Sequence, residues 1–248
     1  PRKKAEPMSR LDDVDDLLRE VARDVVMPRF QSLAPEDIET TSGPDDIVTA
    51  ADREAEALLT PALQGLLPGS IVVGEEGVAE GQADPRALEG ESPVWLVDPV
   101  DGTANFARGS DRFGMMVALC EGGSVNRSWI YFPVTGIMAQ AERGSGAFYG
   151  GEQLGPKAGR YWQDAAADFS HAYVEEPFKS AMLGATASLG SVRRGHCSAY
   201  AYTDLARGLL DLILYYRLYP WDHAPGQLLV EEGWIAQLNQ VDIEGIEA

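Results

Sequence analysis

Apolar residues recur at helical spacing in two segments near the start of the chain. From Ser9 to about Met27, leucines and valines return every three or four residues, which predicts an amphipathic helix that Ser9 and Asp12 would cap. A second helix is expected to begin at Thr49, with an apolar face made of Ala55, Leu58, Leu59, Ala62, Leu63 and Leu66. Pro61 interrupts this face and predicts a kink or an early end.

The rest of the chain contains strand patterns and further helices. Between Phe113 and about Tyr149, short alternating or apolar runs separated by glycine-rich turns predict sequential β-strands. Residues 77–92 are expected to form a loop and residues 150–168 to be irregular. Three later elements are predicted: a helix around 198–210, a strand over 211–216 and a helix over about 223–232. The pattern therefore indicates a mixed α and β protein.

One apolar run leads directly into polar residues. The run from Val94 to Val97 is typical of a short buried strand, and Asp98-Pro99-Val100-Asp101-Gly102-Thr103 follows it. Pro99 is expected to end the strand in a turn, so that Asp98 and Asp101 converge. The N–H groups of Gly102 and Thr103 would face an anion if a helix begins there. An Asp-rich turn that caps a helix is an equally good interpretation of this segment alone.

Two other segments place acidic residues at strand ends. The run from Ile71 to Gly74 reads as a strand followed by Glu75 and Glu76, and Asp222 lies between the strand-like run 212–216 and the next helix. Three acidic strand ends favour a site for a hard divalent cation such as Mg²⁺, which takes oxygen ligands and keeps waters that a phosphate can replace. The cysteines and histidines lack the spacing of a zinc site.

Composition narrows the class of protein. The chain has 248 residues, of which 45% are hydrophobic and 24% charged, as in an ordinary globular protein with a large core. Its formal net charge of −19 argues against nucleic acid or an anionic membrane as a partner. Cys120 and Cys197 are the only cysteines, and no signal-peptide pattern or membrane-length apolar run is found, so we expect a cytoplasmic protein.

Four segments together make the chain resemble the inositol monophosphatase-like family of metal-dependent phosphatases. In family order, they are Asp46-Ile47-Val48-Thr49-Ala50-Ala51-Asp52, Gly74-Glu75-Glu76, the Asp98–Thr103 segment, and Trp221-Asp222-His223-Ala224-Pro225-Gly226. The last segment is similar to a bacterial branch of the family, and the resemblance spans roughly residues 9–233. It implies an α+β fold, the layered αβαβα sandwich, and a single unit over 1–248 that is divisible at about 9–150 and 151–248.

The resemblance also implies roles for individual residues. Glu75, Asp98 and the Val100 carbonyl would hold one Mg²⁺; Asp98, Asp101 and Asp222 would hold a second; and a weaker third ion would lie near Glu75. One cation would lower the pKa of a water that attacks phosphorus, and the other would stabilise the leaving oxygen. Thr103 and Asp52 would orient that water and, with Glu75, act in catalysis. The amides of Gly102 and Thr103 would bind the phosphate, with Asp101 and Asp222 also contacting substrate.

Some residues have a second interpretation. Thr49 and Asp52 have the spacing of a capping pair at a helix start, so Asp52 is either a capping residue or part of the catalytic pair. Glu76 is either a support for the site or a solvated charge. His223 follows a ligand directly, but imidazole is a poor Mg²⁺ ligand, so we expect a structural or substrate-edge role.

Departures from the family pattern concern the substrate and the end of the chain. Inositol-specific members carry an acidic residue about seven positions before the last metal ligand, where this chain has Tyr215, which we take as a substrate contact. Residues 195–200 also depart from the small residues that are usual there. After Gly233 the expected glycine pair, strand and helix are not recognisable, which indicates either a degenerate element or missing residues.

These observations predict a Mg²⁺-dependent phosphatase that acts on a small phosphate monoester, such as an inositol, sugar, polyol or amino-alcohol phosphate. The alternatives are histidinol-phosphate, fructose-bisphosphate or 3′-phosphonucleotide hydrolysis, or a catalytically idle relative that binds metal or a partner. The resemblance further implies lithium sensitivity and a homodimer.

Overall fold

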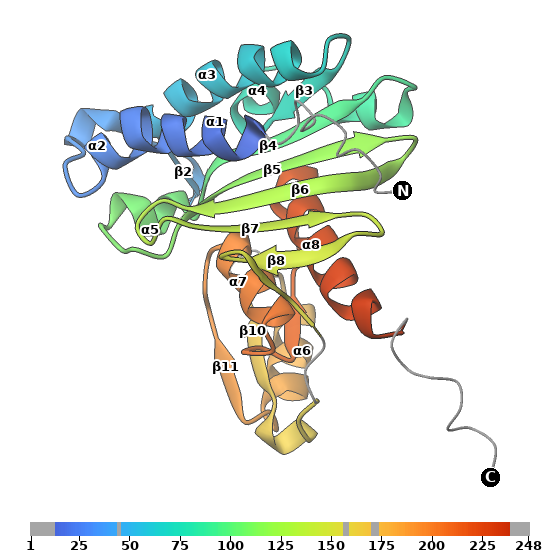
Figure 1. Ribbon diagram of the computed structural model, residues 1–248. Coiled ribbons are helices and arrows are strands. Elements are labelled where there is room, and N and C mark those ends of the chain that lie inside the picture. Colours follow the sequence, from blue (N-terminus) through green and yellow to red (C-terminus); the bar gives the residue numbers. More distant parts are fainter. Residues whose placement is uncertain (1–12, 44–45, 156–158, 170–173, 239–248) are drawn as a thin grey trace, which may run out of the picture.

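The fold consists of alternating layers of helices and sheets (Figure 1). The computed structural model describes residues 13–43, 46–155, 159–169 and 174–238. Helices α1 and α3 cover one face of a seven-stranded sheet, and α7 and α8 lie on the other face. A three-stranded sheet and α6 form the far end of the molecule (Figure 1). The expected α+β layered sandwich is therefore confirmed.

Helical segments occur along the whole described chain. They are α1 (Asp13–Val21), a π-helical turn (Ala22–Val26), α2 (Met27–Arg29), α3 (Ala50–Leu66), α4 (Glu75–Ala79), α5 (Thr103–Ala107), α6 (Phe178–Thr186), α7 (Ser198–Ala206) and α8 (Pro220–Leu238). Short 3₁₀ turns span Pro35–Asp37, Pro85–Glu89 and Trp162–Asp164.

The strands form two sheets and a separate pair. The large sheet contains, in spatial order, β3 (Ile71–Gly74), β4 (Val94–Asp101), β5 (Gly114–Glu121), β6 (Ser124–Phe132), β7 (Ile137–Glu142), β8 (Gly146–Tyr149) and β9 (Glu152–Gln153). Only β3 and β4 pair in parallel in this sheet. The small parallel sheet has the order β11 (Ser191–Arg193), β10 (Ala166–Phe169), β12 (Leu212–Leu214), and β1 (Ile38–Gly43) pairs with β2 (Asp46–Thr49).

The two predicted N-terminal helices are present, with differences in detail. The first runs from Asp13 through the π-helical turn to Arg29, and its predicted caps, Ser9 and Asp12, lie outside the described residues. The expected early end at Pro61 is wrong, because α3 continues to Leu66. Pro61 lies on the exposed side, where solvent can bond the carbonyl group that loses its helical partner, while Leu59 and Leu63 are fully buried against the core.

The buried face of α3 is less apolar than predicted. Leu58 is 47% exposed, whereas Asp52 and Glu56 are buried beside Ala55 and Leu59. The apolar periodicity therefore identified only part of the buried face, because two carboxylates with specific partners also occupy buried positions.

Pro99 does not end its strand as predicted. Strand β4 continues to Asp101, and its pairing with β5 shifts by one residue, because Asp98 lies opposite Met116 and Asp101 lies opposite Gly114. One extra residue on β4 is a β-bulge, the position at which a sheet accepts a proline without losing a needed hydrogen bond. The bulge thus lies between the two aspartates of the polar segment.

Several boundaries also differ from the sequence prediction. The expected loop 77–92 contains the end of α4 and a 3₁₀ turn that Asp84 caps through the Arg86 amide. The segment predicted to be irregular includes β9, a 3₁₀ turn and the start of β10. The late elements are shorter or longer than expected: α7 ends at Ala206, β12 spans three residues, and α8 begins at Pro220, so that Asp222 lies in its first turn.

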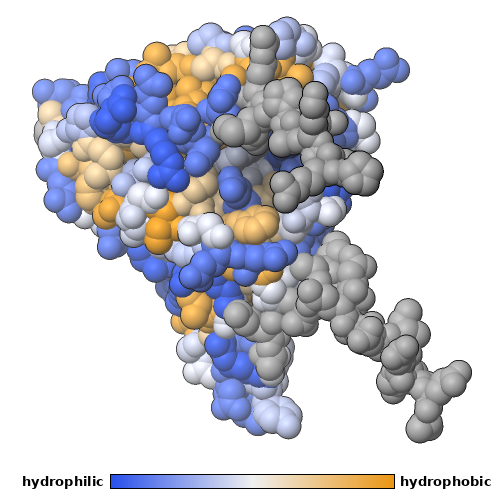
Figure 2. All heavy atoms as spheres, viewed as in Figure 1, coloured by the Kyte–Doolittle hydropathy of each residue, from blue (hydrophilic) through white to orange (hydrophobic). Residues whose placement is uncertain are grey.

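Helix α8 connects the end of the chain to the sheet formed by its middle. It packs against β4, β5, β6, β7 and β8, and against α7. We therefore propose that the chain forms a single unit instead of dividing near residue 150. The face seen in Figure 2 mixes hydrophilic residues with smaller hydrophobic areas. Among the described helices, none combines the length and apolar character needed to cross a bilayer.

Aromatic packing anchors α5 to the N-terminal helical segment. Phe106 and Phe113 are fully buried, their rings lie 4.9 Å apart at a steep angle, and Phe30 stacks against Phe106 at 5.8 Å. Such pairs add attraction to the large apolar area that they bury. This contact fixes the helix that begins at Thr103.

Phe106→Ala is expected to lower the free energy of unfolding by about 3–5 kcal/mol, because it removes a buried aromatic ring and leaves a cavity. Urea denaturation monitored by circular dichroism measures the change. Leu58→Ala is the control, since Leu58 is 47% exposed and should cost less than about 1 kcal/mol. Equal losses for the two variants would contradict this description of the core.

Candidate active site

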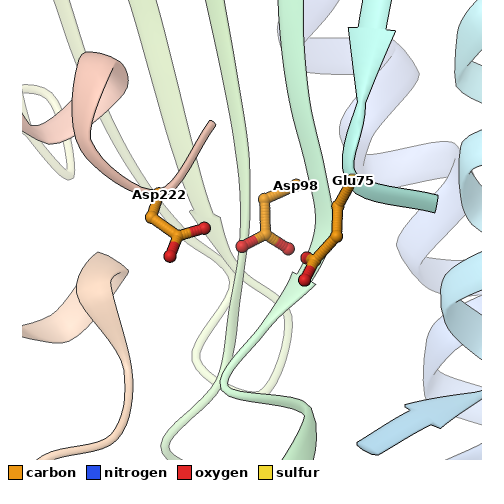
Figure 3. Close-up of side chains that lie close together, drawn as sticks. All are labelled: Glu75, Asp98 and Asp222. Carbon is orange, nitrogen blue, oxygen red and sulfur yellow. The ribbon is translucent and has the colours of Figure 1, made fainter. Parts of the chain in front are cut away.

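Three carboxylates from distant parts of the sequence meet at one end of the large sheet. Glu75 follows β3, Asp98 lies in β4, and Asp222 lies in the first turn of α8 (Figure 3). One carboxylate oxygen from each lies within 4.8 Å of the others. Asp98 is buried and the other two are half-buried. The three acidic segments predicted from the sequence therefore converge at one point.

The three clustered carboxyl groups have raised pKa values. Burial, followed by repulsion from neighbouring carboxylates, raises the pKa values of Glu75 and Asp98 well above the ordinary range. Burial and the charge of Asp101 raise the pKa of Asp222 to about 8. Among the described residues, no ion pair offers any of these three a cationic partner. A divalent cation would supply the missing positive charge, and carboxylate oxygens are the ligands that Mg²⁺ prefers.

Asp101 lies next to the cluster but is held by a helix start. Its Oδ1 accepts a hydrogen bond from the Ser198 amide at 3.0 Å, and its Oδ2 accepts from the Ala199 amide at 2.7 Å and from the Cys197 thiol at 2.8 Å. These donors occupy three of about four acceptor positions of a carboxylate. Asp101 is therefore near the other acids without belonging to the compact group of three.

Thr103 and Asp52, to which the family resemblance assigns the attacking water, are in contact. The Thr103 hydroxyl lies 3.2 Å from Asp52 Oδ1 and 3.0 Å from the Val100 carbonyl. Asp52 also accepts from the Thr49 amide at 2.8 Å, completing a capping box at the start of α3. The geometry is thus compatible with both interpretations of Asp52, since this residue caps α3 and also contacts Thr103. Burial raises the pKa of Asp52 to about 6, although these hydrogen bonds oppose that rise.

Gly102 connects β4 to α5 and has a left-handed backbone, with φ of 85°. A β-carbon there would lie 3.1 Å from the Arg112 carbonyl and 3.2 Å from the Cys197 sulfur, so both conformation and space require glycine. Helix α5 begins at Thr103, which meets the condition stated for anion binding by these amides. The first N–H groups of this helix have no preceding turn to bond, so they are available to a ligand.

A cavity of about 200 Å³ opens over these groups. Glu75, Asp98, Asp101, Asp222 and Thr103 line it, and Tyr215 forms part of its wall. The predicted site residues around the two aspartates therefore face one shared space. Asp52 lies behind Thr103, to which it is hydrogen-bonded.

Tyr215 and His223 belong to an ordered aromatic group at the side of the cavity. The Tyr215 ring stacks on Tyr202 at 5.9 Å and meets the His223 ring edge-on at 4.6 Å. His223 Nε2 lies 3.0 Å from the Arg217 carbonyl, which can only accept, so Nε2 carries the proton and Nδ1 accepts from the Tyr202 hydroxyl at 3.1 Å. Both ring nitrogens have protein partners, in agreement with a structural role for His223.

Sequence reasoning missed two residues at this site. Cys197 donates its thiol to Asp101 from 96 positions away, and no local pattern indicates that contact. Glu56 accepts hydrogen bonds from the amides of Glu76 and Gly77. The signal for Glu56 was available, since an acid four residues after Asp52 shares its helix face with Leu59 and Leu63.

Comparison with known proteins identifies the family. The inositol monophosphatase family matches residues 8–233. The inositol-1-monophosphatase of Bacillus subtilis (strain 168) is 29% identical over 233 residues, covering 91% of this chain and 84% of that protein. A fructose-1,6-bisphosphatase/inositol-1-monophosphatase of Thermotoga maritima is 29% identical over 231 residues, covering 91% and 82%.

Solved structures agree with this match. The inositol monophosphatase of Thermotoga maritima superposes with a TM-score of 0.78 and 28% sequence identity, covering 91% of this chain and 84% of that one. The family match extends over most of the chain and includes the four acidic segments that build the site. The chain therefore belongs to the inositol monophosphatase family and is a phosphoric monoester hydrolase.

Proposed function

We propose that this chain hydrolyses a small phosphate monoester with Mg²⁺ bound by Glu75, Asp98 and Asp222. The observation that carries the proposal is the convergence of these three carboxylates beside the hydrogen-bonded pair Thr103 and Asp52. An all-oxygen donor set fits Mg²⁺, and the nearby imidazole of His223 has both nitrogens engaged. Asp101, with one acceptor position left, and the Val100 carbonyl complete the proposed ligands of two ions, and a third ion near Glu75 rests on family resemblance alone.

Bound divalent cations would neutralise the phosphate and make a water molecule a better nucleophile at neutral pH. The protein residues then have defined tasks. The Thr103 hydroxyl can donate to Asp52 or the Val100 carbonyl while its oxygen accepts a hydrogen bond from the attacking water. The amides of Gly102 and Thr103, which line the same cavity as the carboxylates, would bind phosphate oxygens. Catalysis in this proposal comes from positioning and charge, without a covalent enzyme intermediate.

The leaving group would lie against the wall that contains Tyr215. That tyrosine packs on two other rings and lies where inositol-specific relatives carry an acid, so the site lacks that acceptor for substrate hydroxyls. Inositol 1-phosphate or a related sugar or polyol phosphate is the first candidate. Fructose 1,6-bisphosphate and histidinol phosphate, for which other relatives are named, and 3′-phosphonucleotides are the alternatives. Lithium inhibition, a homodimer and a cytoplasmic location remain expectations from sequence.

A panel of phosphate monoesters tests the proposal directly. Purified protein with Mg²⁺ should release phosphate from at least one of inositol 1-phosphate, fructose 1,6-bisphosphate, histidinol phosphate and 3′-phosphoadenosine 5′-phosphate. EDTA should abolish the release, and Asp98→Asn should lower it at least about 100-fold, because a buried cation ligand is lost. Mg²⁺ binding without turnover of any ester would instead support the idle-relative alternative.

The pair Thr103 and Asp52 is tested by removing only the hydroxyl. Thr103→Val should lower kcat by about 10²–10⁴-fold, the usual contribution of a group that handles the proton of a nucleophile. Thr103→Ser is the matched control, since it keeps the hydroxyl, and should retain most of the activity. Steady-state kinetics at saturating Mg²⁺ distinguishes the two, and similar rates for both variants would rule out this role for the hydroxyl.

The raised pKa of Asp222 predicts how the stability of the metal-free protein changes with pH. Asp222 has a pKa of about 8 in the folded protein but an ordinary carboxyl pKa of about 4 when unfolded. The folded state therefore binds more protons between these values, and stability should rise as the pH falls from 8 toward 5. Thermal unfolding in EDTA should show a higher midpoint at pH 6 than at pH 8, with a smaller difference in Asp222→Asn. Identical pH profiles for the two proteins would contradict the prediction.

A further inference from the structure

Glu56 is a buried carboxylate that the proposed reaction does not use. It lies in α3 one turn after Asp52 and is 7% exposed. Its Oε2 accepts the amide of Glu76 at 2.9 Å, and its Oε1 accepts the amide of Gly77 at 2.7 Å. Both oxygens are thus bonded to consecutive backbone amides of another helix. A bidentate contact of this kind fixes the orientation as well as the position of that backbone.

The two amides belong to the first turn of α4. This helix spans Glu75–Ala79, and Gly74 at its N-cap has no side chain that could bond the first N–H groups. A capping side chain normally satisfies the amides of the second and third helical residues, which here are Glu76 and Gly77. Glu56 therefore supplies from α3 the cap that Gly74 cannot supply.

Gly74 leaves the space that Glu56 fills. A β-carbon at Gly74 would lie 2.3 Å from the carboxyl carbon of Glu56 and within 2.5 Å of both its oxygens. The backbone of Gly74, with φ of −103° and ψ of 160°, is one that any residue can adopt. A side chain at Gly74 would therefore displace the carboxylate of Glu56 without straining the backbone, so the position of Glu56 depends on glycine at residue 74.

Glu75 lies between this glycine and the two capped amides. We propose that Glu56 is a positioning residue that holds Glu75 ready to bind a divalent cation, an inference that rests on the proposed cation site. Glu75 faces Asp98 and Asp222, and like charges push it away from them (Figure 3). Clamping the following two amides prevents the backbone from yielding to that repulsion before the cation arrives.

Glu56→Gln tests this role with little change of shape. The amide oxygen can accept one backbone N–H, but the NH₂ group faces the other and cannot. Mg²⁺ titrated into metal-free protein by calorimetry should bind about 10–100-fold more weakly than to wild type, the usual effect of losing a residue that orients a ligand. With an active ester, the Mg²⁺ concentration for half-maximal rate should rise by a similar factor, while kcat at saturating Mg²⁺ stays within about threefold.

Glu232→Gln is the matched control. Glu232 is likewise buried, at 3% exposed, and accepts a backbone amide, that of Gly146, at 3.1 Å. It lies ten residues after Asp222 in α8, about 15 Å along the helix axis. Its loss should lower the thermal midpoint without changing Mg²⁺ affinity, so it separates a general loss of stability from a loss of positioning.

A second variant tests the contact between Glu56 and Gly74 by changing the glycine. Gly74→Ala should weaken Mg²⁺ binding as Glu56→Gln does, because its β-carbon displaces the carboxylate. Combined with Glu56→Ala, it should cause no further loss, since the atoms that it would strike are gone. Gly65→Ala is the control, because a β-carbon there meets nothing within 4 Å.

The outcomes separate the two proposals. Wild-type affinity for Mg²⁺ in Glu56→Gln and Gly74→Ala, with wild-type binding intact, would overturn the positioning role and leave the proposed function standing. Failure of the wild-type protein to bind Mg²⁺ would overturn both. Weaker binding in these variants, unchanged binding in Glu232→Gln and no added loss in the double variant would support the role of Glu56.

Discussion

The rest of the structure depends on a group of buried and half-buried carboxylates that lie close together. Carboxylates at the ends of β3 and β4, at the start of α8 and along α3 all point to one region, and desolvation makes each costly to ionise. The protein holds some of them with its own donors. Asp101 rests on the start of α7, Asp52 on Thr49 and Thr103, and Glu56 on two amides of α4. Glu75, Asp98 and Asp222 are left facing one another, and that imbalance gives the site its affinity for a cation in our proposal.

Local sequence signals located part of this region. An apolar run followed by acids correctly located β3 and β4, but the third expected strand end was wrong, because Asp222 lies in the first turn of α8. What these signals missed depends on contacts between distant segments. Cys197 and Asp101 are 96 positions apart, and the burial of Glu56 depends on the amides of a helix 20 residues away. Periodicity also assigned Leu58 to the core, although it is exposed. Hydrophobic spacing treats every carboxylate as exposed, so it could not show that Asp52 and Glu56, which have hydrogen-bond partners, occupy the buried face instead.

Membership of the family determines the class of reaction more firmly than the substrate. The acidic segments around the proposed cation site resemble family motifs, whereas Tyr215 lies where that resemblance leads us to expect an acid in inositol-specific members. Tyr215, Tyr202 and His223 form an aromatic group on that side of the cavity, joined by ring contacts and by the hydrogen bonds of the imidazole. Helix α8 contributes to both groups, through the neighbouring residues Asp222 and His223, whereas Tyr202 lies in α7 and Tyr215 follows β12. Substitutions in α7 or after β12 can therefore change this side of the cavity while the carboxylates are retained.

The bulge in β4 has a consequence for how this sequence can change. Side chains alternate between the two faces of a regular strand, so residues three apart point in opposite directions. The extra residue beside Pro99 restores the parity of Asp98 and Asp101, whose partners Met116 and Gly114 are two apart and share a face. Removing one of the residues between them would leave the aspartates two apart in a regular strand, still on one face, but it would abolish the bulge that bends β4 between them. The number of residues between the aspartates therefore determines the local bend of the strand as well as the face that both side chains share.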